Sequence, residues 1–233
     1  MSQLAVAMKS GSLLHQYQME WGKYYASVLN LLGSTGVILP LGDPHHGQPN
    51  ATTFTTIGEE QVTFTWSEAP ASFDTPLDLT NPDSFQGIVS VVTFNGTDEE
   101  ADTPDITYFS RGDGTNDSPF SIGAWVRPDA TAGMKVIFSK YETTGSNREY
   151  RFVCTTAERI QLLMRDESAS AGINRSNLAI LSLSSLSFVV ATYDGAGGAS
   201  AADTVHLYLN GANDDDAASN NASYVAMENG TAT

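Results

Sequence analysis

The stretch Pro119-Phe-Ser-Ile-Gly-Ala-Trp-Val-Arg-Pro-Asp129 decides the fold of this chain. From Phe120 to Val126 every second residue is apolar, which is the pattern of a β-strand with one buried face. Pro128 ends the strand because proline has no backbone N–H to donate. Similar short strands follow at regular intervals, so the sequence predicts an all-β protein.

Working outward from this stretch, the same alternation and the turn residues between segments predict the other strands. The expected strands cover residues 36–43, 52–66, 88–94, 134–140, 149–154, 159–165, 187–195 and 205–209. Residues 149–154 and 159–165 are expected to pair across a four-residue turn. Asn95-Gly96 is a strong hairpin signal, and a turn is expected at Asn210-Gly211. The acidic run 214–216 is expected to be a solvated loop.

Composition limits the partners and the chemistry. The net charge is −16, and only four of the 233 residues are lysine, which argues against binding to a nucleic-acid backbone. An acidic surface of this kind suits solubility and a saline environment. The single cysteine, Cys154, excludes an intramolecular disulfide, and its strand context predicts a small buried residue rather than a nucleophile.

Apolar residues between positions 13 and 32 recur with helical spacing, and Gly33 stands where a C-terminal cap belongs. We therefore expect an N-terminal arm and helix over residues 1–33 and a sandwich domain over 34–233. The helix either closes one end of the sandwich or docks the protein onto an assembly or its own copies. The residues expected to make an assembly contact are Tyr17, Trp21, Tyr24 and Tyr25.

Targeting signals are not evident in the sequence. The apolar run at the N-terminus is too short for a secretory signal and has no basic segment before it. No window approaches the roughly 18 apolar residues that a membrane span needs. We therefore expect synthesis in a cytoplasm and no membrane partner.

Five short motifs occur in the order and spacing of a laminin-G-like domain. They are Phe94-Asn-Gly96, the stretch 119–129, Ile137-Phe-Ser-Lys140, Val190-Ala-Thr-Tyr-Asp-Gly195 and Leu207-Tyr-Leu-Asn-Gly211. More broadly, residues 88–211 resemble the concanavalin A-like lectin/glucanase jelly roll, and 24–87 do so loosely. The resemblance implies a sandwich of two antiparallel sheets with six or seven strands.

The sequence departs from this family in two places. The family's tryptophan before the Val190 strand is replaced by Leu186-Ser-Phe188, and the two closing strands after Gly211 are missing. The sheet would then be completed by the N-terminal region, by a strand of another subunit, or by residues outside this sequence.

The sequence predicts no enzymatic activity. Glucanases of the superfamily carry a Glu-x-Asp-x-Glu strand that aligns acid and nucleophile on one face. Here the acidic run 98–102 follows a turn, and Asp166-Glu167 ends a strand. Hydrolase and metalloprotease motifs of the Gly-x-Ser-x-Gly and His-Glu-x-x-His types do not occur.

Candidate binding residues cluster before the 119–129 stretch. The oxygens of Asp113, Asn116 and Asp117 are calcium candidates, since hard cations prefer oxygen ligands; a plain polar turn is the alternative. Calcium is the one cofactor that the sequence suggests. Tyr108 and Tyr141 are candidates for stacking on sugars, with ordinary packing as the alternative.

Three functions follow from these observations. The first is a non-enzymatic virion surface protein, a capsid decoration or a tail or fibre component. It would be made in the host cytoplasm, assemble with its own copies or other virion proteins, and contact host glycans. The second is a secreted or cell-surface carbohydrate-binding adhesin. The third is a residual glycoside hydrolase.

Overall fold

The computed structural model describes residues 36–39, 53–58, 60–67, 72–74, 91–96, 98–128, 133–143, 147–183 and 185–230. The chain forms two compact units, Met1–Thr103 and Pro104–Thr233, which are described separately. The expected helix with Tyr17, Trp21, Tyr24 and Tyr25 lies outside the described residues, and so does the expected domain boundary at residue 33. Both stay predictions.

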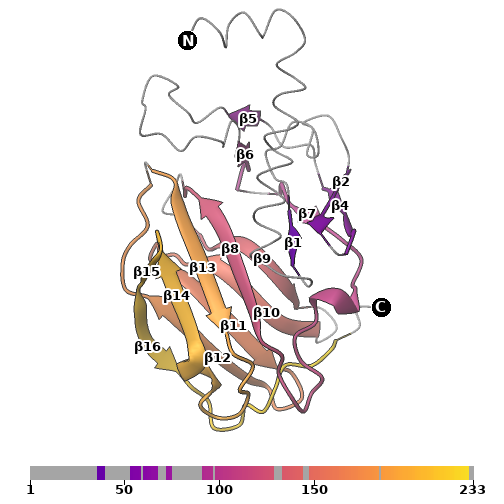
Figure 1. Cartoon of the computed structure of the whole chain (residues 1–233), viewed down its shortest axis with the longest axis vertical. Coiled ribbons are helices and arrows are strands. Elements are labelled where there is room, and N and C mark those ends of the chain that lie inside the picture. The colour runs from indigo at the N-terminus through magenta and orange to yellow at the C-terminus, as the bar shows by residue number, and fades with distance from the viewer. Residues whose placement is uncertain are drawn as a thin grey trace, which may run out of the picture. The chain divides into compact units, whose positions relative to one another are not determined.

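The second unit is a sandwich of two antiparallel sheets (Figure 1). The five-stranded sheet has the order β16 (Asp215–Ser219), β12 (Ala171–Asn177), β11 (Ile160–Asp166), β10 (Asn147–Cys154) and β9 (Lys135–Glu142). The four-stranded sheet has the order β15 (Ala212–Asn213), β14 (Val205–Leu209), β13 (Ser187–Tyr193) and β8 (Phe120–Val126). The predicted all-β architecture is confirmed, and the described residues of this unit form one sheet of five strands and one of four.

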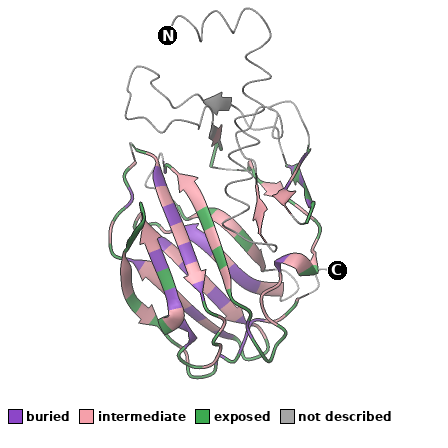
Figure 2. Ribbon diagram, in the orientation of Figure 1, coloured by how far each residue is buried: buried purple, intermediate pink, exposed green. Residues whose placement is uncertain are grey.

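Alternating burial along the strands explains why the sheets pack face to face. In β13, Val189 and Ala191 are fully buried, whereas Phe188 and Val190 are partly exposed (Figure 2). The core draws on both sheets and includes Tyr150, Phe152, Leu162, Met164, Ile173, Val189, Ala191, Val205 and Leu207. Cys154 is buried among them as predicted, and burial raises the pKa of its thiol.

Two local predictions in this unit are confirmed. Strands β10 and β11 form a hairpin in which Cys154 is opposite Ile160. Asn210 and Gly211 have φ angles of 50° and 85° and connect β14 to β15. Positive φ at both central residues is what a two-residue hairpin turn with the twist of the sheet requires.

The acidic run 214–216 is not a solvated loop, so that prediction is wrong. Asp215 and Asp216 begin strand β16, which pairs with β12. The Asp214 carboxylate accepts hydrogen bonds from Asn177 Nδ2 at 2.7 Å and from the Ala179 N–H at 3.0 Å. Partners 35 or more positions away thus bring the Asp214 carboxylate into the fold.

The first unit contains three small antiparallel sheets in its described part. They are β1 (Val37–Ile38) with β3 (Ile57–Gly58), β2 (Thr53–Thr55) with β4 (Thr63–Trp66) and β7 (Ala101–Asp102), and β5 (Ser72–Asp74) with β6 (Val91–Thr93). Phe54 is buried against Phe64 and Trp66, with ring centroids 5.2 and 4.9 Å away. This aromatic cluster supplies the apolar contacts of the β2–β4 pair.

The hairpin predicted at Asn95-Gly96 is wrong. The strands on either side of it, β6 and β7, pair with β5 and β4 respectively and not with each other. Gly96 has a φ of 74°, and the Asn95 side-chain oxygen accepts the Asp98 N–H at 3.2 Å. The two residues form a turn, but long-range pairing decides which strands it joins.

Within the described residues the helical elements are two short 3₁₀ turns, η2 (Thr107–Phe109) and η3 (Ala201–Thr204). No helix in that part of the chain has the length and apolar character needed to cross a membrane.

Candidate functional site

Loop 111–117, which leads into β8, holds the calcium candidates. The Asp113 carboxylate accepts hydrogen bonds from the N–H groups of Thr115 at 2.8 Å and Asn116 at 2.7 Å. The hydrogen bond from the Asn116 N–H, followed by that from the Thr115 N–H, lowers the pKa of the exposed Asp113 carboxyl group. Asp113 and Asn116 therefore share one turn in which the carboxylate orders its own backbone.

Asp117 lies in a different environment, because its carboxylate points into the sandwich. It is 9% exposed and accepts hydrogen bonds from the hydroxyls of Tyr193 at 2.6 Å and Tyr224 at 2.8 Å. The Met227 N–H donates to its other oxygen at 2.7 Å. Burial raises the pKa of Asp117, and these three hydrogen bonds offset the effect in part.

Asp113 and Asn116 thus lie in an exposed turn, whereas the Asp117 carboxylate is buried, and the three calcium candidates do not converge on one site. No group of three or more His, Cys, Asp or Glu side chains that could hold a metal occurs among the residues the structure describes. Gly112 forms an isolated bridge with Asp117 and is covered by Met227. The calcium site stays a prediction.

The two tyrosine candidates lie on different elements, and each is next to an arginine. Tyr108 belongs to η2, with the Arg111 guanidinium 6.0 Å from its ring centroid. Tyr141 belongs to β9, and Arg151 of β10 lies 4.7 Å over its ring. Cation–π contacts of this kind are satisfied without a ligand, so sugar stacking by these two rings stays a prediction.

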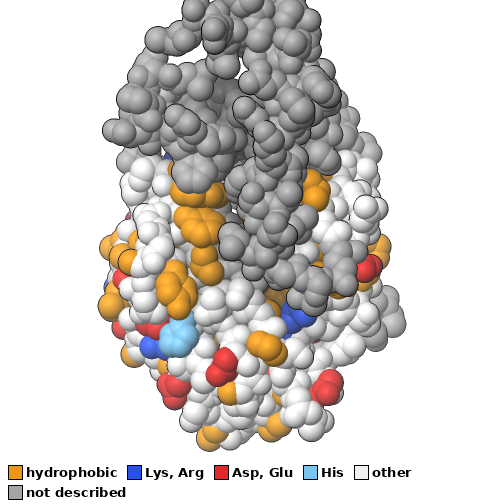
Figure 3. All heavy atoms as spheres, in the orientation of Figure 1, with side chains coloured by type: hydrophobic (Ala, Val, Ile, Leu, Met, Phe, Trp, Pro, Cys, Tyr) orange, Lys and Arg blue, Asp and Glu red, His pale blue; other side chains and the backbone are white. Residues whose placement is uncertain are grey.

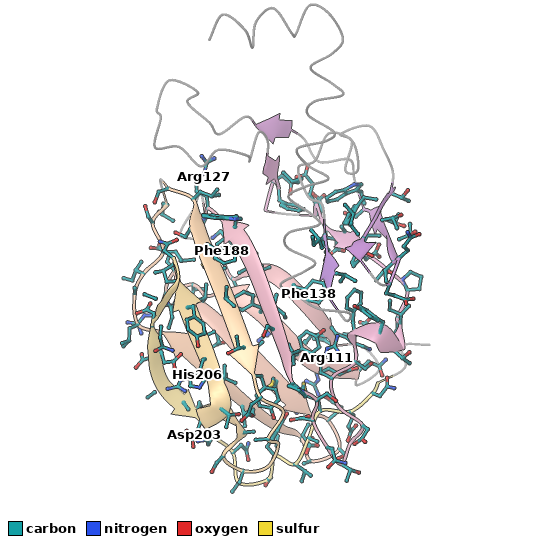
Figure 4. All side chains as sticks on the ribbon, viewed as in Figure 1. Arg111, Arg127, Phe138, Phe188, Asp203 and His206 are labelled. Carbon is teal, nitrogen blue, oxygen red and sulfur yellow. The ribbon has the colours of Figure 1, made fainter. Side chains whose placement is uncertain are left out.

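The outer face of the four-stranded sheet carries a group of apolar side chains that we call the platform: Trp125, Phe188, Val190 and Tyr208. Strand pairing brings them together, since Phe188 is opposite Trp125 and Val190 is opposite Tyr208. The Trp125 and Phe188 ring centroids are 5.0 Å apart. Figure 3 shows a column of hydrophobic side chains on this face, and Figure 4 places Phe188 on it.

Gly123 leaves a space in the platform. A Cβ at this position would lie 3.5 Å from both the Phe188 ring and the Val190 side chain, at ordinary van der Waals distance. Gly123 is exposed in the middle of β8, and its φ is not among the positive values that favour glycine. The backbone therefore does not require glycine here, and its effect is to keep the surface between these two side chains open.

Polar groups border the platform at its β14 end. His206, labelled in Figure 4, has Nδ1 2.8 Å from a carboxylate oxygen of Asp215. The Leu207 N–H donates to the other Asp215 oxygen at 2.6 Å. Burial acts to raise the pKa of Asp215, but the hydrogen bonds from Leu207, His206 and Asn213 outweigh it and hold the pKa below its usual value.

The outward positions of β8, β13 and β14 include no Asp or Glu. Hydrolysis of a glycoside requires two carboxyl groups flanking the scissile bond, about 5 to 10 Å apart. The platform thus offers aromatic, apolar and neutral polar contacts.

The sequence reasoning did not select Phe188, Tyr208 or Gly123. A signal was present, because Phe188-Val-Val190 is apolar on both faces of its strand, whereas a strand with one solvated face alternates apolar with polar residues. Which outward residues are neighbours depends on the pairing of β8, β13 and β14, and local pattern does not contain that information.

A family model described as the concanavalin A-like lectin/glucanases superfamily matches residues 95–231, more than half of the chain. The chain belongs to this superfamily. Comparisons with curated proteins and with solved structures give no match. The superfamily is compatible with carbohydrate binding, and its two-sheet sandwich agrees with the fold of the second unit.

Proposed function

We propose that this protein is a non-enzymatic carbohydrate-binding module that holds saccharides on the platform. The observation that carries the proposal is the partly exposed Phe188 ring beside Gly123 on the outer face of the four-stranded sheet, where the atoms nearest to a Cβ would be those of the Phe188 and Val190 side chains. An aromatic ring offers an apolar face to the C–H groups of a sugar, and neutral polar groups around it accept and donate hydrogen bonds to hydroxyls.

The arrangement suits a neutral saccharide. Tyr208, which is opposite Val190, and Thr192, which is opposite His206, provide hydroxyl groups on the same face of the sheet. No carboxylate projects from β8, β13 or β14 on this face. A contiguous apolar surface of this kind on a soluble protein commonly marks a binding site.

A glycan array followed by calorimetry with the best ligand tests the proposal. Gly123→Val fills the space between Phe188 and Val190, and we expect it to weaken binding at least about tenfold, which is 1.4 kcal/mol. Valine is a good strand residue at an exposed position, so the fold should be retained. Ser139→Val on the outer face of β9 is the matched control and should bind as the original chain does.

A protein that binds no glycan on the array contradicts the proposal. So does a Gly123→Val variant whose affinity equals that of the original chain while circular dichroism shows both to be folded. Phe188→Ala provides an independent check, because it removes the ring without filling the space.

We also propose a setting, which is the surface of a virion, where the module joins its own copies or other structural proteins. The acidic, lysine-poor composition supports this setting, as it favours solubility of a crowded assembly in salt. Immunogold labelling of purified virus particles whose genome encodes this chain tests the proposed setting. An absence of label from particles, together with label on cell surfaces, would instead favour the secreted adhesin.

A further inference from the structure

The outer face of the five-stranded sheet carries three arginines close together. Arg151 of β10 and Arg165 of β11 alternate with buried core residues, so they point away from the core. Arg148 of β10 is opposite Tyr141, and the Arg151 guanidinium lies 4.7 Å over the Tyr141 ring. The sequence has only 11 lysines and arginines against 27 acidic residues. Three arginines on one face therefore reverse the charge of the chain locally.

Glu167 supplies a carboxylate to these cations. Its Oε2 accepts a hydrogen bond from Arg148 Nε at 2.7 Å and lies 3.5 Å from Arg165 Nε, which is buried and makes no hydrogen bond. Among the described residues Arg151 has no carboxylate partner, and its buried Nε makes no hydrogen bond either. Three positive charges and one negative charge leave two positive charges uncompensated. A partly buried charge without a partner is costly, and a bound anion relieves that cost.

Leu163 lies at the centre of this face. It is opposite Arg151 of β10 on one side and opposite Asn174 of β12 on the other. Arg165 follows two positions later in β11, about 7 Å along the strand. Its side chain reaches toward β12, since a Cβ at Gly172 would lie 3.7 Å from Arg165 Nη1. Two guanidinium groups and a side-chain amide thus surround one partly exposed leucine.

Neutral polar groups next to Leu163 have hydrogen-bonding capacity to spare. Gln161 Nε2 donates to Asn174 Oδ1 at 3.1 Å and to Ser176 Oγ at 2.9 Å. Within the described part of the chain, Gln161 Oε1 and Asn174 Nδ2 have no partner. The outward positions of β11 and β12 include no Asp or Glu. This face therefore offers cations, amides and a small apolar surface together.

We infer that this face is a binding site for an acidic saccharide that carries one carboxylate on the bound sugar, such as a uronic or sialic acid residue. Arg151 and Arg165 hold the carboxylate, because a planar guanidinium donates two parallel hydrogen bonds to such a group. Stacking on Tyr141 uses the face of the Arg151 guanidinium and leaves its N–H edge available. Leu163 contacts the C–H groups of the sugar ring, and Asn174 bonds to a hydroxyl.

Charge favours a short saccharide over a polyanion. The net charge of −16 repels long anionic chains from the molecule as a whole, and the two uncompensated guanidinium groups act only locally. A sulfated polymer or an acidic peptide would bring its further charges against this acidic surface. The site is on the opposite sheet from the platform and does not depend on it.

Calorimetry with the full chain tests the inference. The ligands are glucuronate- and sialate-bearing oligosaccharides, their methyl esters, a sulfated oligosaccharide and hexaglutamate. A carboxylated saccharide should bind with one site per chain, and its methyl ester, the sulfated sugar and hexaglutamate should each bind at least about tenfold more weakly. Added salt should weaken the binding of the carboxylated saccharide.

Variants of the face locate the site. Asn174→Asp is nearly isosteric and keeps the oxygen that accepts from Gln161, but its negative charge should weaken binding by about tenfold or more. Arg151→Ala removes a charged donor and should also weaken binding by about tenfold or more. Arg127→Ala, at an exposed position directly after β8, removes the same charge elsewhere and should stay within about twofold.

Several results would overturn the inference. They are an absence of binding to every carboxylated saccharide, equal binding of the methyl ester, and tighter binding of the sulfated sugar or of hexaglutamate. Unchanged affinity of a folded Asn174→Asp or Arg151→Ala variant also overturns it. Should Arg151→Ala fail to fold, Asn174→Asp decides. The platform is tested separately with neutral saccharides, so the two proposals can fail independently.

Discussion

The Asp117 carboxylate accepts a hydrogen bond of 2.8 Å from the hydroxyl of Tyr224, a residue 107 positions later in the chain. The same oxygen accepts the Tyr193 hydroxyl, which in turn accepts the Gly197 N–H at 2.8 Å. One buried carboxylate thereby joins the loop before β8, the end of β13 and the segment after β16. Burial of the two tyrosines, together with the hydrogen bonds to Asp117 and its negative charge, raises the pKa of both hydroxyls well above the usual range.

Removing one of these hydroxyls should measurably destabilise the protein. Tyr224→Phe keeps the buried ring but takes away a hydrogen bond to a charged acceptor, and we expect a loss of about 1.5–3 kcal/mol in the free energy of unfolding. Urea denaturation measures it. Tyr208→Phe, on the partly exposed outer face of β14, is the control and should change stability by less than about 0.5 kcal/mol. Equal losses in both variants would contradict the role of Asp117.

The raised pKa of Asp117 predicts a pH dependence. Because burial makes the folded state bind a proton more tightly than the unfolded state, the free energy of unfolding should fall as the pH rises from the ordinary value of 3.8 through the folded pKa. Asp117→Asn does not titrate and should lack this fall. Urea denaturation of both proteins across the acid range measures the difference, and two parallel curves would contradict the assignment.

Two ion pairs of the second unit should contribute differently to the free energy of unfolding. Glu149 is 1% exposed and contacts Lys140 Nζ at 2.9 Å, and Lys140 also contacts Asp105. Glu149→Ala leaves the buried Lys140 ammonium with one partner fewer, and we expect the free energy of unfolding to fall by about 3–5 kcal/mol.

The exposed pair Arg159–Asp216 is the matched comparison, with side chains 35% and 38% exposed. Asp216→Ala should cost less than about 1 kcal/mol, because water screens the pair. Thermal or urea denaturation of both variants measures the contrast. A Glu149→Ala variant as stable as the Asp216→Ala variant would contradict the larger contribution to stability that we expect of the buried pair.

The calcium candidates lead to a further test. Since the Asp113 carboxylate is bonded to its own turn and Asp117 faces two tyrosines, we expect calcium and chelator to leave the melting temperature unchanged. Differential scanning calorimetry measures this. A rise with added calcium that disappears in Asp113→Ala would instead establish a cation site in this loop.

Local interactions explain why many elements were predictable. The alternation in 119–129, the β10–β11 hairpin and the Asn210-Gly211 turn each depend on residues within a few positions of one another. Side-chain period and positive φ act at this range, so sequence carries them directly. The burial of Cys154 follows in the same way from its strand context.

The sequence by itself thus determined the superfamily sandwich, most of its strands in the second unit, and the lack of the carboxylate motif that glucanases use. Tertiary structure alone decided which strands the Asn95-Gly96 turn joins and that Asp214 to Asp216 enter the fold. It alone decided that Asp117 meets Tyr224 rather than Asp113, and that Phe188 lies beside Gly123. These outcomes depend on contacts between residues far apart in the chain, whose partners are chosen when the sheets bury their apolar faces.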